Sequence, residues 1–331
     1  MRALVTGGGG FLGGAIVRAL LKRGDAVRSF SRGDYPELRK AGVETVRGDL
    51  ADAGAAFEAV KGCDIVFHAA GKPGLWGRYE DYYQTNVEGT RSIISACREH
   101  GVRRLVYTSS PSVVFGGEDI EGKDESLPYP ETHEAHYPRT KAEAERLVRA
   151  ADGPELATVS LRPHLIWGPG DHHLVPRIVA GAKAGMLRRV GSFKKVDTVY
   201  IDNAAEAHLL AADRLSPGSS VSGKVYFITN GEPRELWGFI DSILGAAGLP
   251  PVEGRVSPRL AYAAGVVLEG WHRLFGLDSE PRMTRFLARE LSTAHWFDIG
   301  AARRELDYVP RVSIEEGLRR LKASFDGSWR N

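Results

Sequence analysis

Cysteine and an excess of charge of one sign are what this sequence lacks. It has two cysteines in 331 residues, Cys63 and Cys97, which lie far apart, each inside an apolar run. This excludes a disulfide framework and gives no spacing for a zinc site. Lys and Arg total 44 against 42 Asp and Glu, and the two signs are interspersed. Such a balance provides no basic surface for a nucleic-acid partner.

Long uninterrupted apolar runs are also missing. The most apolar stretch, 260–277 (LAYAAGVVLEGWHRLFGL), carries Glu269, His272 and Arg273, so we expect no transmembrane span. Its apolar positions recur at helical spacing, which leaves open a cover over an apolar ligand pocket, a helix on a membrane surface, or a buried core helix. The first residues, MRALVTGGGG, reach glycines before a signal-peptide core can form. We therefore expect a cytoplasmic protein, with contact to a membrane surface or to an enzyme assembly left open.

What the sequence has is a regular alternation of strand and helix patterns from residue 2 to about residue 170. The strand patterns are ALVTG, AVRSFSR, VETVRGDL, CDIVFHAAG, RLVYTSS and ATVSLRPHLIWGP. The helical patterns between them are FLGGAIVRALLKRG, AFEAVKG, YYQTNVEGTRSIISACREHG and YPRTKAEAERLVRAA. This order predicts an α/β fold, a Rossmann-type doubly wound parallel sheet with helices on both faces.

The alternation loosens in the second half of the chain. Further helical patterns lie at 173–185 and 233–247, and a short strand pattern lies at 224–229. We expect a dinucleotide-binding domain over residues 1–170, to which the chain returns at about 198–229. Residues 171–197 and 230–331 are expected to form a smaller substrate-binding cap.

A glycine cluster, TGGGGFLG, lies directly between the first strand and the first helix. Gly7, Gly10 and Gly13 have G-x-x-G-x-x-G spacing. Glycines permit a sharp turn and let a pyrophosphate approach the backbone, and the start of the helix adds a positive dipole end. The cluster therefore predicts a dinucleotide site, with Phe11 and Leu12 in the same loop.

The residues after the next strands refine this site. The second strand runs into Ser31 and Arg32 without an acid at the turn. An arginine there suits the 2′-phosphate of NADP(H), whereas an acid suits NAD(H). NADP(H) is favoured, and nearby Asp34 keeps NAD(H) open. The expected contacts at the ends of the third and fourth strands are Asp49 and Leu50, and Ala69, Ala70 and Gly71.

The candidate catalytic residues follow the fifth strand and begin the next helix. Ser110 ends the strand pattern YTSS, and HYPRTK places Tyr137 and Lys141 four residues apart. The lysine would lie on the same side of the helix as the tyrosine, where its charge favours the phenolate, and it can also donate to a nicotinamide ribose. Tyr137 is thus a candidate general acid for reducing a ketone, with Ser110 polarising the oxygen. Tyr-x-x-x-Lys is common by chance, so its position after the glycine loop gives it weight.

Taken together, TGGGGFLG, GDL, VFHAAG, TNVEGT, YTSSPSVVF, YPRTK and LRPHLIWGPGD resemble the extended short-chain dehydrogenase/reductase family, over essentially the whole chain. The strings after YTSS and RPH are similar to its 3β-hydroxysteroid dehydrogenase branch. The longer strings FSRGDYPEL, GLWGRYEDYYQTNVEGT and KKVDTVYIDNAA resemble bacterial reductases of 2-alkyl-3-oxoalkanoic acids that serve long-chain olefin biosynthesis.

The resemblance implies a catalytic triad of Ser110, Tyr137 and Lys141, with Pro163 near the nicotinamide. It also implies a homodimer through helices at about 83–100 and 137–151. Three departures from the pattern stand out. Ser31-Arg32 replaces the acid that sterol enzymes carry, and Phe115 stands where a tyrosine is frequent. Pro111 leaves open whether Ser109 or Ser110 faces the substrate.

The activity so implied is the reversible, NADPH-dependent reduction of a long-chain 2-alkyl-3-oxoalkanoic acid to the 2-alkyl-3-hydroxy acid. Its possible partners are other enzymes of the olefin pathway. Alternatives are an NAD(P)-dependent 3β-hydroxysteroid or sterol-4α-carboxylate 3-dehydrogenase, a nucleotide-sugar epimerase or dehydratase, and a non-catalytic NADP sensor. Candidate partners of the substrate carboxylate are His164, Arg139 and Lys72. The alkyl chains are expected against residues 258–291 or against the GLWG segment with Leu75 and Trp76.

Overall fold

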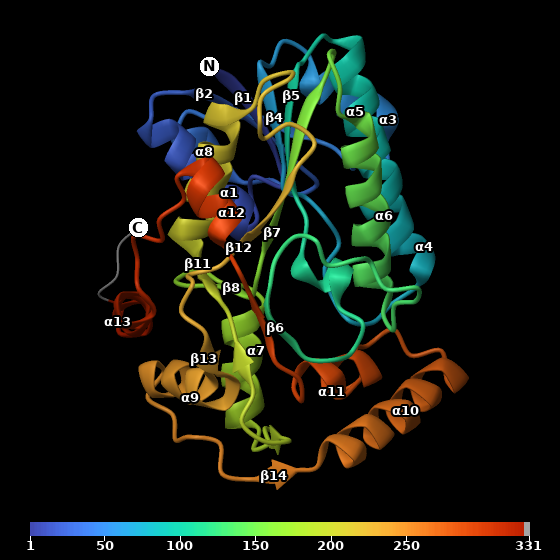
Figure 1. Ribbon diagram of the computed structural model, residues 1–331, viewed down its shortest axis with the longest axis vertical. Helices are drawn as coiled ribbons and strands as arrows, with labels where there is room; N and C mark the ends of the chain where they lie inside the picture. Colours follow the sequence, from blue (N-terminus) through green and yellow to red (C-terminus); the bar gives the residue numbers. More distant parts are fainter. Residues whose placement is uncertain (328–331) are drawn as a thin grey trace.

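A computed structural model describes residues 1–327 and has a seven-stranded parallel sheet at its centre (Figure 1). The strand order is β12-β7-β5-β4-β1-β2-β3, so the chain runs outward from β1 to β3 and then returns to β4 beside β1. The strands are β1 (Arg2–Thr6), β2 (Ala26–Ser31), β3 (Glu44–Arg47), β4 (Ile65–His68), β5 (Arg104–Thr108), β7 (Ala157–Pro163) and β12 (Val225–Ile228). The reversal between β1 and β4 is the topological switch point where such sheets bind ligands.

Helices cover both faces of this sheet, as Figure 1 shows. One face carries α1 (Phe11–Lys22), α8 (Ile201–Arg214) and α12 (Gly300–Leu306); the other carries α3 (Ala53–Val60), α5 (Gly89–Glu99) and α6 (His136–Ala151). Successive residues of β1 serve the two faces in turn, since Ala3 and Val5 join one buried cluster and Leu4 joins the other. The predicted α/β fold with a doubly wound parallel sheet is confirmed.

Local details differ from the predicted helices. The segment predicted as one long helix contains α4 (Tyr79–Tyr82), a π-helix, η1 (Tyr83–Glu88), and then α5. Two further short helices are α2 (Pro36–Lys40) and the 3-10 helix η2 (Pro111–Val114). Helix α8 was not predicted, because its buried face consists mainly of alanines, which give a weak apolar pattern.

A second, smaller sheet joins segments that are far apart in the sequence. Its order is β13-β10-β15-β6, with β6 (Ile120–Lys123), β10 (Lys195–Val196), β13 (Arg234–Glu235) and β15 (His295–Phe297). Two strand pairs accompany it, β8 (Ile166–Trp167) with β11 (Val199–Tyr200) and β9 (Arg189–Val190) with β14 (Arg255–Val256). Since β6 pairs with β15, the region around residue 120 is tied to the C-terminal half. The division into two domains near residue 170 stays a prediction.

The remaining helices belong to the C-terminal half. They are α7 (Leu174–Lys183), α9 (Leu236–Ala246), α10 (Pro258–Leu274), α11 (Arg285–Glu290) and α13 (Ile314–Phe325). Helix α10 covers most of the apolar stretch 260–277 and lies at the periphery, packed on α11 (Figure 1). Because Val267 is 67% exposed, the interpretation of a buried core helix is wrong. No helix within residues 1–327 combines the length and the apolar character needed to cross a membrane.

Candidate active site

The glycine loop forms a surface without side chains at the start of α1. Gly7 has a left-handed φ of 70°, and its N–H donates to the Phe30 carbonyl over 2.8 Å. A Cβ on Gly13 would lie 2.1 Å from the Gly7 carbonyl oxygen, so a side chain at that position does not fit. Gly10 caps α1, whose first residues Phe11 and Leu12 are half-buried. The first N–H groups of the helix are thus available at the sheet's carboxyl edge, which suits a phosphate group.

The end of β2 carries the residues predicted to choose the cofactor. Ser31 pairs in register with Arg47 of β3, and the Arg47 Nε donates to the carbonyl of exposed Arg32 over 3.0 Å. Asp34 forms an ion pair with Arg39, which holds the pKa of that carboxyl below its usual value. Two guanidinium groups therefore lie at this edge, and the nearby acid is already paired. Arg47 was missed, since only the strand register places it beside Ser31.

An aromatic ring lies over the glycine loop. A Cβ built on Gly9 would come within 2.3 Å of the Tyr35 ring, so tyrosine and loop are in close contact. Tyr35 is 37% exposed and immediately precedes α2. Sequence reasoning missed Tyr35. The available signal was an aromatic residue in the turn after the second strand, where its ring can stack on a base.

The ends of β3 and β4 close against the same loop. Leu50 is buried and contacts Gly89, while the Asp49 carboxylate accepts the Ala51 N–H over 3.0 Å. Ala70 lies opposite Gly7, where an added Cβ would meet the Ala70 Cα at 3.0 Å. The three residues Ala69, Ala70 and Gly71 thus follow β4 directly beside the glycine loop. Their predicted contacts with a cofactor stay predictions.

A buried hydrogen-bond chain connects these strand ends to the helix behind them. The Thr6 hydroxyl lies 2.8 Å from Nδ1 of His68, whose Nε2 lies 3.0 Å from the Thr90 hydroxyl. Burial, with a smaller effect of Lys141, lowers the pKa of His68 to about 3. The imidazole is therefore neutral at physiological pH and serves as a connector.

Asn86 lies in the π-helix η1 and holds the segment that follows β4. Its Oδ1 accepts the Lys72 backbone N–H over 2.7 Å, and its Nδ2 donates to the Thr140 hydroxyl over 3.0 Å. The residue is only 2% exposed. It thus links the β4 edge to α6, and π turns are frequent at functional sites. Sequence reasoning missed Asn86, because nothing in TNVEGT distinguishes its asparagine from the polar residues around it.

Helix α6 begins at His136, so Tyr137 lies in its first turn and Lys141 one turn further on. Lys141 is 5% exposed; its Nζ donates to the Thr108 carbonyl over 2.6 Å and lies 4.2 Å from the centre of the Tyr107 ring. Burial lowers the pKa of Lys141 to about 7, against the opposing effect of Glu145. The amine is thus held beneath the carboxyl edge of the sheet.

Ser110 and Tyr137 come together at this edge. Burial raises the pKa of the Tyr137 phenol, a hydrogen bond with Ser110 lowers it, and the charge of Glu290 raises it. Ser110 also caps η2 and lies 2.9 Å from the Ser112 hydroxyl. Ser109 is 3% exposed and lies near the Glu145 carboxylate inside the fold. The geometry thus places Ser110 beside the phenol, while the lowering of the phenol pKa by Lys141 stays a prediction.

Glu290, at the end of α11, lies close enough to the phenol for its charge to act on it. Burial raises the pKa of its carboxyl to about 7, and Arg177 opposes this effect. Its backbone carbonyl accepts a hydrogen bond from Nε2 of His295 over 2.9 Å, which anchors the end of the helix. Sequence reasoning missed Glu290, because nothing local to RFLARE indicates that this segment folds back over Tyr137.

The three candidate partners of a substrate carboxylate are engaged elsewhere. Arg139 pairs with Glu143 and lies 4.5 Å from the Tyr79 ring centre, and Lys72 lies 3.4 Å from Asp81. His164 lies 3.2 Å from His295, and burial holds the pKa of His164 well below its usual value. A neutral, buried imidazole supplies no cation for a carboxylate.

The end of β7 carries a strained turn beside the site. Pro163 is buried and pairs in register with Ile228 of β12. Two residues on, Leu165 has φ of 43°, one of two non-glycine residues with a left-handed backbone within residues 1–327. That conformation is costly for leucine, and such strain gathers at functional sites.

The GLWG segment closes against the end of α10. The Trp76 indole N–H donates to the Leu277 carbonyl over 3.1 Å, and its ring lies edge-on to His272. Leu75 is half-buried beside it. This segment and α10 therefore form one wall of the region above Tyr137.

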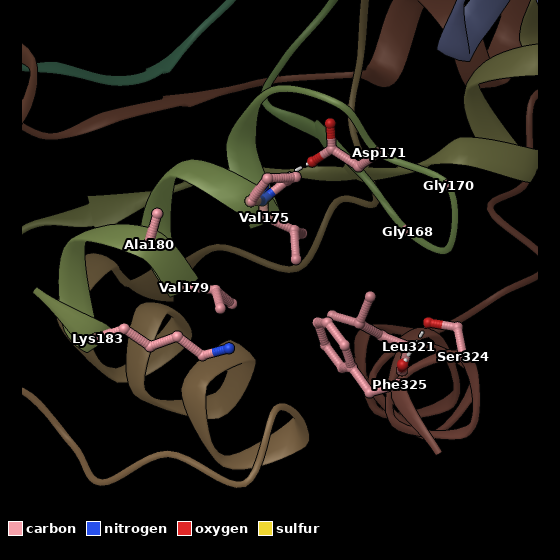
Figure 2. A pocket seen from close by; sticks show the side chains of 11 residues that line it. Gly168, Gly170, Asp171, Val175, Val179, Ala180, Lys183, Leu321, Ser324 and Phe325 are labelled. Carbon is pink, nitrogen blue, oxygen red and sulfur yellow. Dashed lines mark hydrogen bonds between the residues drawn. The ribbon is translucent and has the colours of Figure 1, made fainter. Parts of the chain in front are cut away.

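A groove of about 330 Å³ lies elsewhere, between α7 and α13. Figure 2 shows Val175 and Val179 of α7 facing Leu321 and Phe325 of α13, while the Asp171 carboxylate accepts the Val175 N–H. None of the predicted site residues lines it. We therefore assign the candidate active site to the sheet edge around Tyr137 and not to this groove.

Comparison with known proteins fits this geometry. The model of the 3-beta hydroxysteroid dehydrogenase/isomerase family matches residues 4–256. The chain is 53% identical over 327 residues to a protein of Stenotrophomonas maltophilia (strain K279a) named 2-alkyl-3-oxoalkanoate reductase, covering 98% of this chain and 99% of that one. A protein of the same name from Shewanella oneidensis is 49% identical, covering 97% of this chain and 86% of that one.

A solved structure supports the fold. The crystal structure of UDP-glucuronic acid 4-epimerase from Bacillus cereus in complex with NAD has a TM-score of 0.75 at 21% identity, with both chains covered completely. The resemblance drawn from the sequence motifs is confirmed. The chain belongs to the 3-beta hydroxysteroid dehydrogenase/isomerase family, within the extended short-chain dehydrogenases/reductases.

Proposed function

We propose that this protein is an NADPH-dependent reductase that converts a long-chain 2-alkyl-3-oxoalkanoic acid to the 2-alkyl-3-hydroxy acid, reversibly. The observation that carries the proposal is the meeting of Ser110 and Tyr137, with Lys141 held beneath, at the edge that also carries the glycine loop. The two relatives named 2-alkyl-3-oxoalkanoate reductase supply the substrate class. A 3-oxo acid has the ketone that this arrangement can protonate.

The chain's residues divide the chemistry as follows. Ala69, Gly71 and Pro163 would hold a nicotinamide, which would supply hydride for C3 of the substrate. Ser110 donates a hydrogen bond to the 3-oxo oxygen and holds it near the phenol. Tyr137 then gives its proton to that oxygen as charge develops, which completes the alcohol. The protonated form of Lys141, one helical turn away, favours the resulting phenolate, and a pKa of about 7 leaves the amine partly protonated at neutral pH.

The basic edge at the end of β2 supports the choice of NADP(H). Arg32 and Arg47 can bond a 2′-phosphate, and Asp34, which would otherwise bond a ribose hydroxyl, is paired with Arg39. The side-chain-free loop from Gly7 to Gly13 suits the pyrophosphate. Pro163, Ala69 and Gly71 complete the proposed lining on the nicotinamide and ribose side.

The resemblance of the sequence motifs suggests a setting for the reaction. We propose long-chain olefin biosynthesis in the cytoplasm, at a membrane surface or in an assembly with other enzymes of the pathway. A homodimer through α5 and α6 is part of the same proposal. The alternative is oxidation of a 3β-hydroxysteroid or a sterol 4α-carboxylate, which the family's description favours and the same catalytic residues would serve.

The direct test follows NADPH oxidation by purified protein with a synthetic 2-alkyl-3-oxo acid, or NADP reduction with the 2-alkyl-3-hydroxy acid, which does not lose carbon dioxide unaided. Tyr137→Phe is expected to lower kcat by about 10²- to 10⁴-fold, because it removes the proton donor. Tyr226→Phe is the matched control, since Tyr226 lies on the edge strand β12 and its phenol bonds Glu305 of α12. Turnover of a sterol carboxylate without turnover of the oxo acid would overturn the proposal, as would full activity in Tyr137→Phe.

A further inference from the structure

Helix α10 turns a continuous apolar face outward, which we call the α10 outer face. Seven large apolar residues on the helix and just after it are more than a third exposed: Leu260 (61%), Val266 (48%), Val267 (67%), Trp271 (56%), Leu274 (77%), Phe275 (55%) and Leu277 (39%). Single exposed apolar residues are ordinary, but a contiguous patch usually marks an interaction site. We therefore expect another molecule to bind the α10 outer face.

The inner side of α10 fixes this orientation. Gly265 lies so close to α11 that a Cβ there would be 2.7 Å from the Arg285 nitrogen. One turn on, Glu269 is 4% exposed and accepts the Arg285 backbone N–H over 2.7 Å and its Nε over 3.0 Å. Rotating the helix would break these hydrogen bonds and press the apolar side chains into the space that only Gly265 leaves at α11. The apolar residues thus cannot turn inward.

The charges around the outer face are those of a helix that lies on a lipid surface. Glu269 is the one acidic residue of α10, and it is buried, whereas Arg259 and Arg273 are exposed near the two ends. Arg273 also lies 3.4 Å from Glu269 and 5.4 Å from the centre of the Trp76 ring. Beyond the helix, Asp278, Glu280 and Arg282 are exposed. An apolar face with a tryptophan, bordered by arginines, suits the boundary between lipid headgroups and acyl chains, and arginines are attracted to anionic headgroups. With 17 residues the helix is about 25 Å long, enough to rest along a surface.

We propose that the α10 outer face docks the protein on anionic lipid bilayers. The helix lies parallel to the surface, with Val267, Trp271 and Leu274 among the acyl chains and the two arginines at the headgroups.

The docked face is continuous with the wall of the candidate active site. The Tyr262 hydroxyl on the inner side of α10 lies 3.2 Å from Glu134, two residues before α6, and Trp76 of the GLWG segment bonds the Leu277 carbonyl. On the proposed function, docking would bring this wall of the site to the lipid surface in which a substrate with two alkyl chains dissolves. The docking itself does not rest on that function.

Vesicle flotation of the full-length protein tests the docking. We expect the wild type to float with phosphatidylglycerol/phosphatidylcholine vesicles and to do so less in high salt or with phosphatidylcholine alone. Val267→Asp should reduce the bound fraction about tenfold. Val309→Asp is the matched control, because Val309 is 66% exposed against 67% for Val267 but lies between α12 and α13, and it should float like the wild type.

Three results would overturn the docking proposal. They are the absence of flotation by the wild type, equal loss of flotation in both variants, and a dimer seen by light scattering that only Val267→Asp dissociates. The last result would assign the face to a second copy. Thermal unfolding of each variant shows that it is folded. NADPH oxidation with a short, water-soluble 2-alkyl-3-oxo acid is measured in parallel, so that failure of the proposed reaction is separate from failure of docking.

Discussion

Two regions bound the candidate active site, and each is held by a buried carboxylate. The floor consists of α6 and the end of β5, where Glu145 of α6 bonds Arg162 of β7 over 2.6 Å with side-chain exposures of 0% and 2%. The outer wall consists of α10 and α11, where Glu269 bonds Arg285 over 3.0 Å with exposures of 5% and 32%. The floor pair is sealed on all sides, whereas the wall pair touches solvent through its arginine.

The difference indicates how each region serves the proposed reaction. Tyr137 and Lys141 sit on the sealed helix, so the groups that move a proton keep their positions. The wall packs on one side only and turns its other side, with Val267 and Trp271, to the outside. We infer that the floor sets the chemistry and that the wall admits the substrate. Three predictions test this contrast, in order of expected size.

Removing the arginine of each pair should affect stability very differently. Arg162→Met leaves the Glu145 carboxylate buried without its partner, and we expect a loss of about 3–5 kcal/mol in the free energy of unfolding. Arg285→Met should cost about 1–2 kcal/mol, since Glu269 keeps the Arg285 backbone N–H and lies 3.4 Å from Arg273. Urea unfolding measures both values.

A double replacement checks the cause of that difference. Arg162→Met with Glu145→Leu should recover most of the loss, because no uncompensated charge then remains in the floor. Equal losses in Arg162→Met and Arg285→Met would remove the contrast between floor and wall. A double variant as unstable as Arg162→Met alone would assign the loss to packing and not to charge.

The sequence predicted the floor and the phosphate loop because their signals are local. Gly7, Gly10 and Gly13 lie in one turn, and Tyr137 and Lys141 lie one turn apart on one helix, so spacing alone fixes their relation. Glu290 and Arg47 reach the site only through the folding of α11 and the register of β3 on β2, which no short pattern encodes. Helix α8 was missed for a different reason, because the alanines of its buried face give only a weak apolar pattern.

The two arginines at the ends of β2 and β3 can be tested through their effect on cofactor binding. Arg47→Ser and Arg32→Ser should each raise KM for NADPH about tenfold, which corresponds to about 1.4 kcal/mol of binding, and should leave KM for NADH nearly unchanged. Arg103→Ser is the control. Arg103 precedes β5, at the amino ends of the strands and so away from the carboxyl edge, and it bonds the Pro154 carbonyl. Steady-state kinetics with both cofactors measures the ratio. An equal rise for NADPH and NADH would remove the argument for a 2′-phosphate site.

The smallest expected effect comes from Glu290, a carboxyl of the wall whose charge acts on Tyr137 of the floor. Glu290 ionises near pH 7, and its negative charge raises the pKa of Tyr137. Oxidation of the hydroxy acid needs the phenolate as the base. Glu290→Gln removes that charge, so the rate of NADP reduction against pH should shift to lower pH by about half a unit, or about threefold at a fixed pH below the phenol pKa.

The pH dependence of the free energy of unfolding tests the pKa of Glu290 independently. Its pKa is raised from 4.5 to about 7, so the folded state holds the proton more tightly than the unfolded chain does. The stability from this proton is fully present below pH 4.5 and is lost as the pH rises toward 7, and Glu290→Gln should lack this dependence. Glu58→Gln is the control, since Glu58 is exposed on α3, on the other side of the sheet from the wall, and should change neither profile. If Glu290→Gln shifts the unfolding profile and leaves the rate profile unchanged, Glu290 belongs to the wall alone, and floor and wall act independently in the proton transfer.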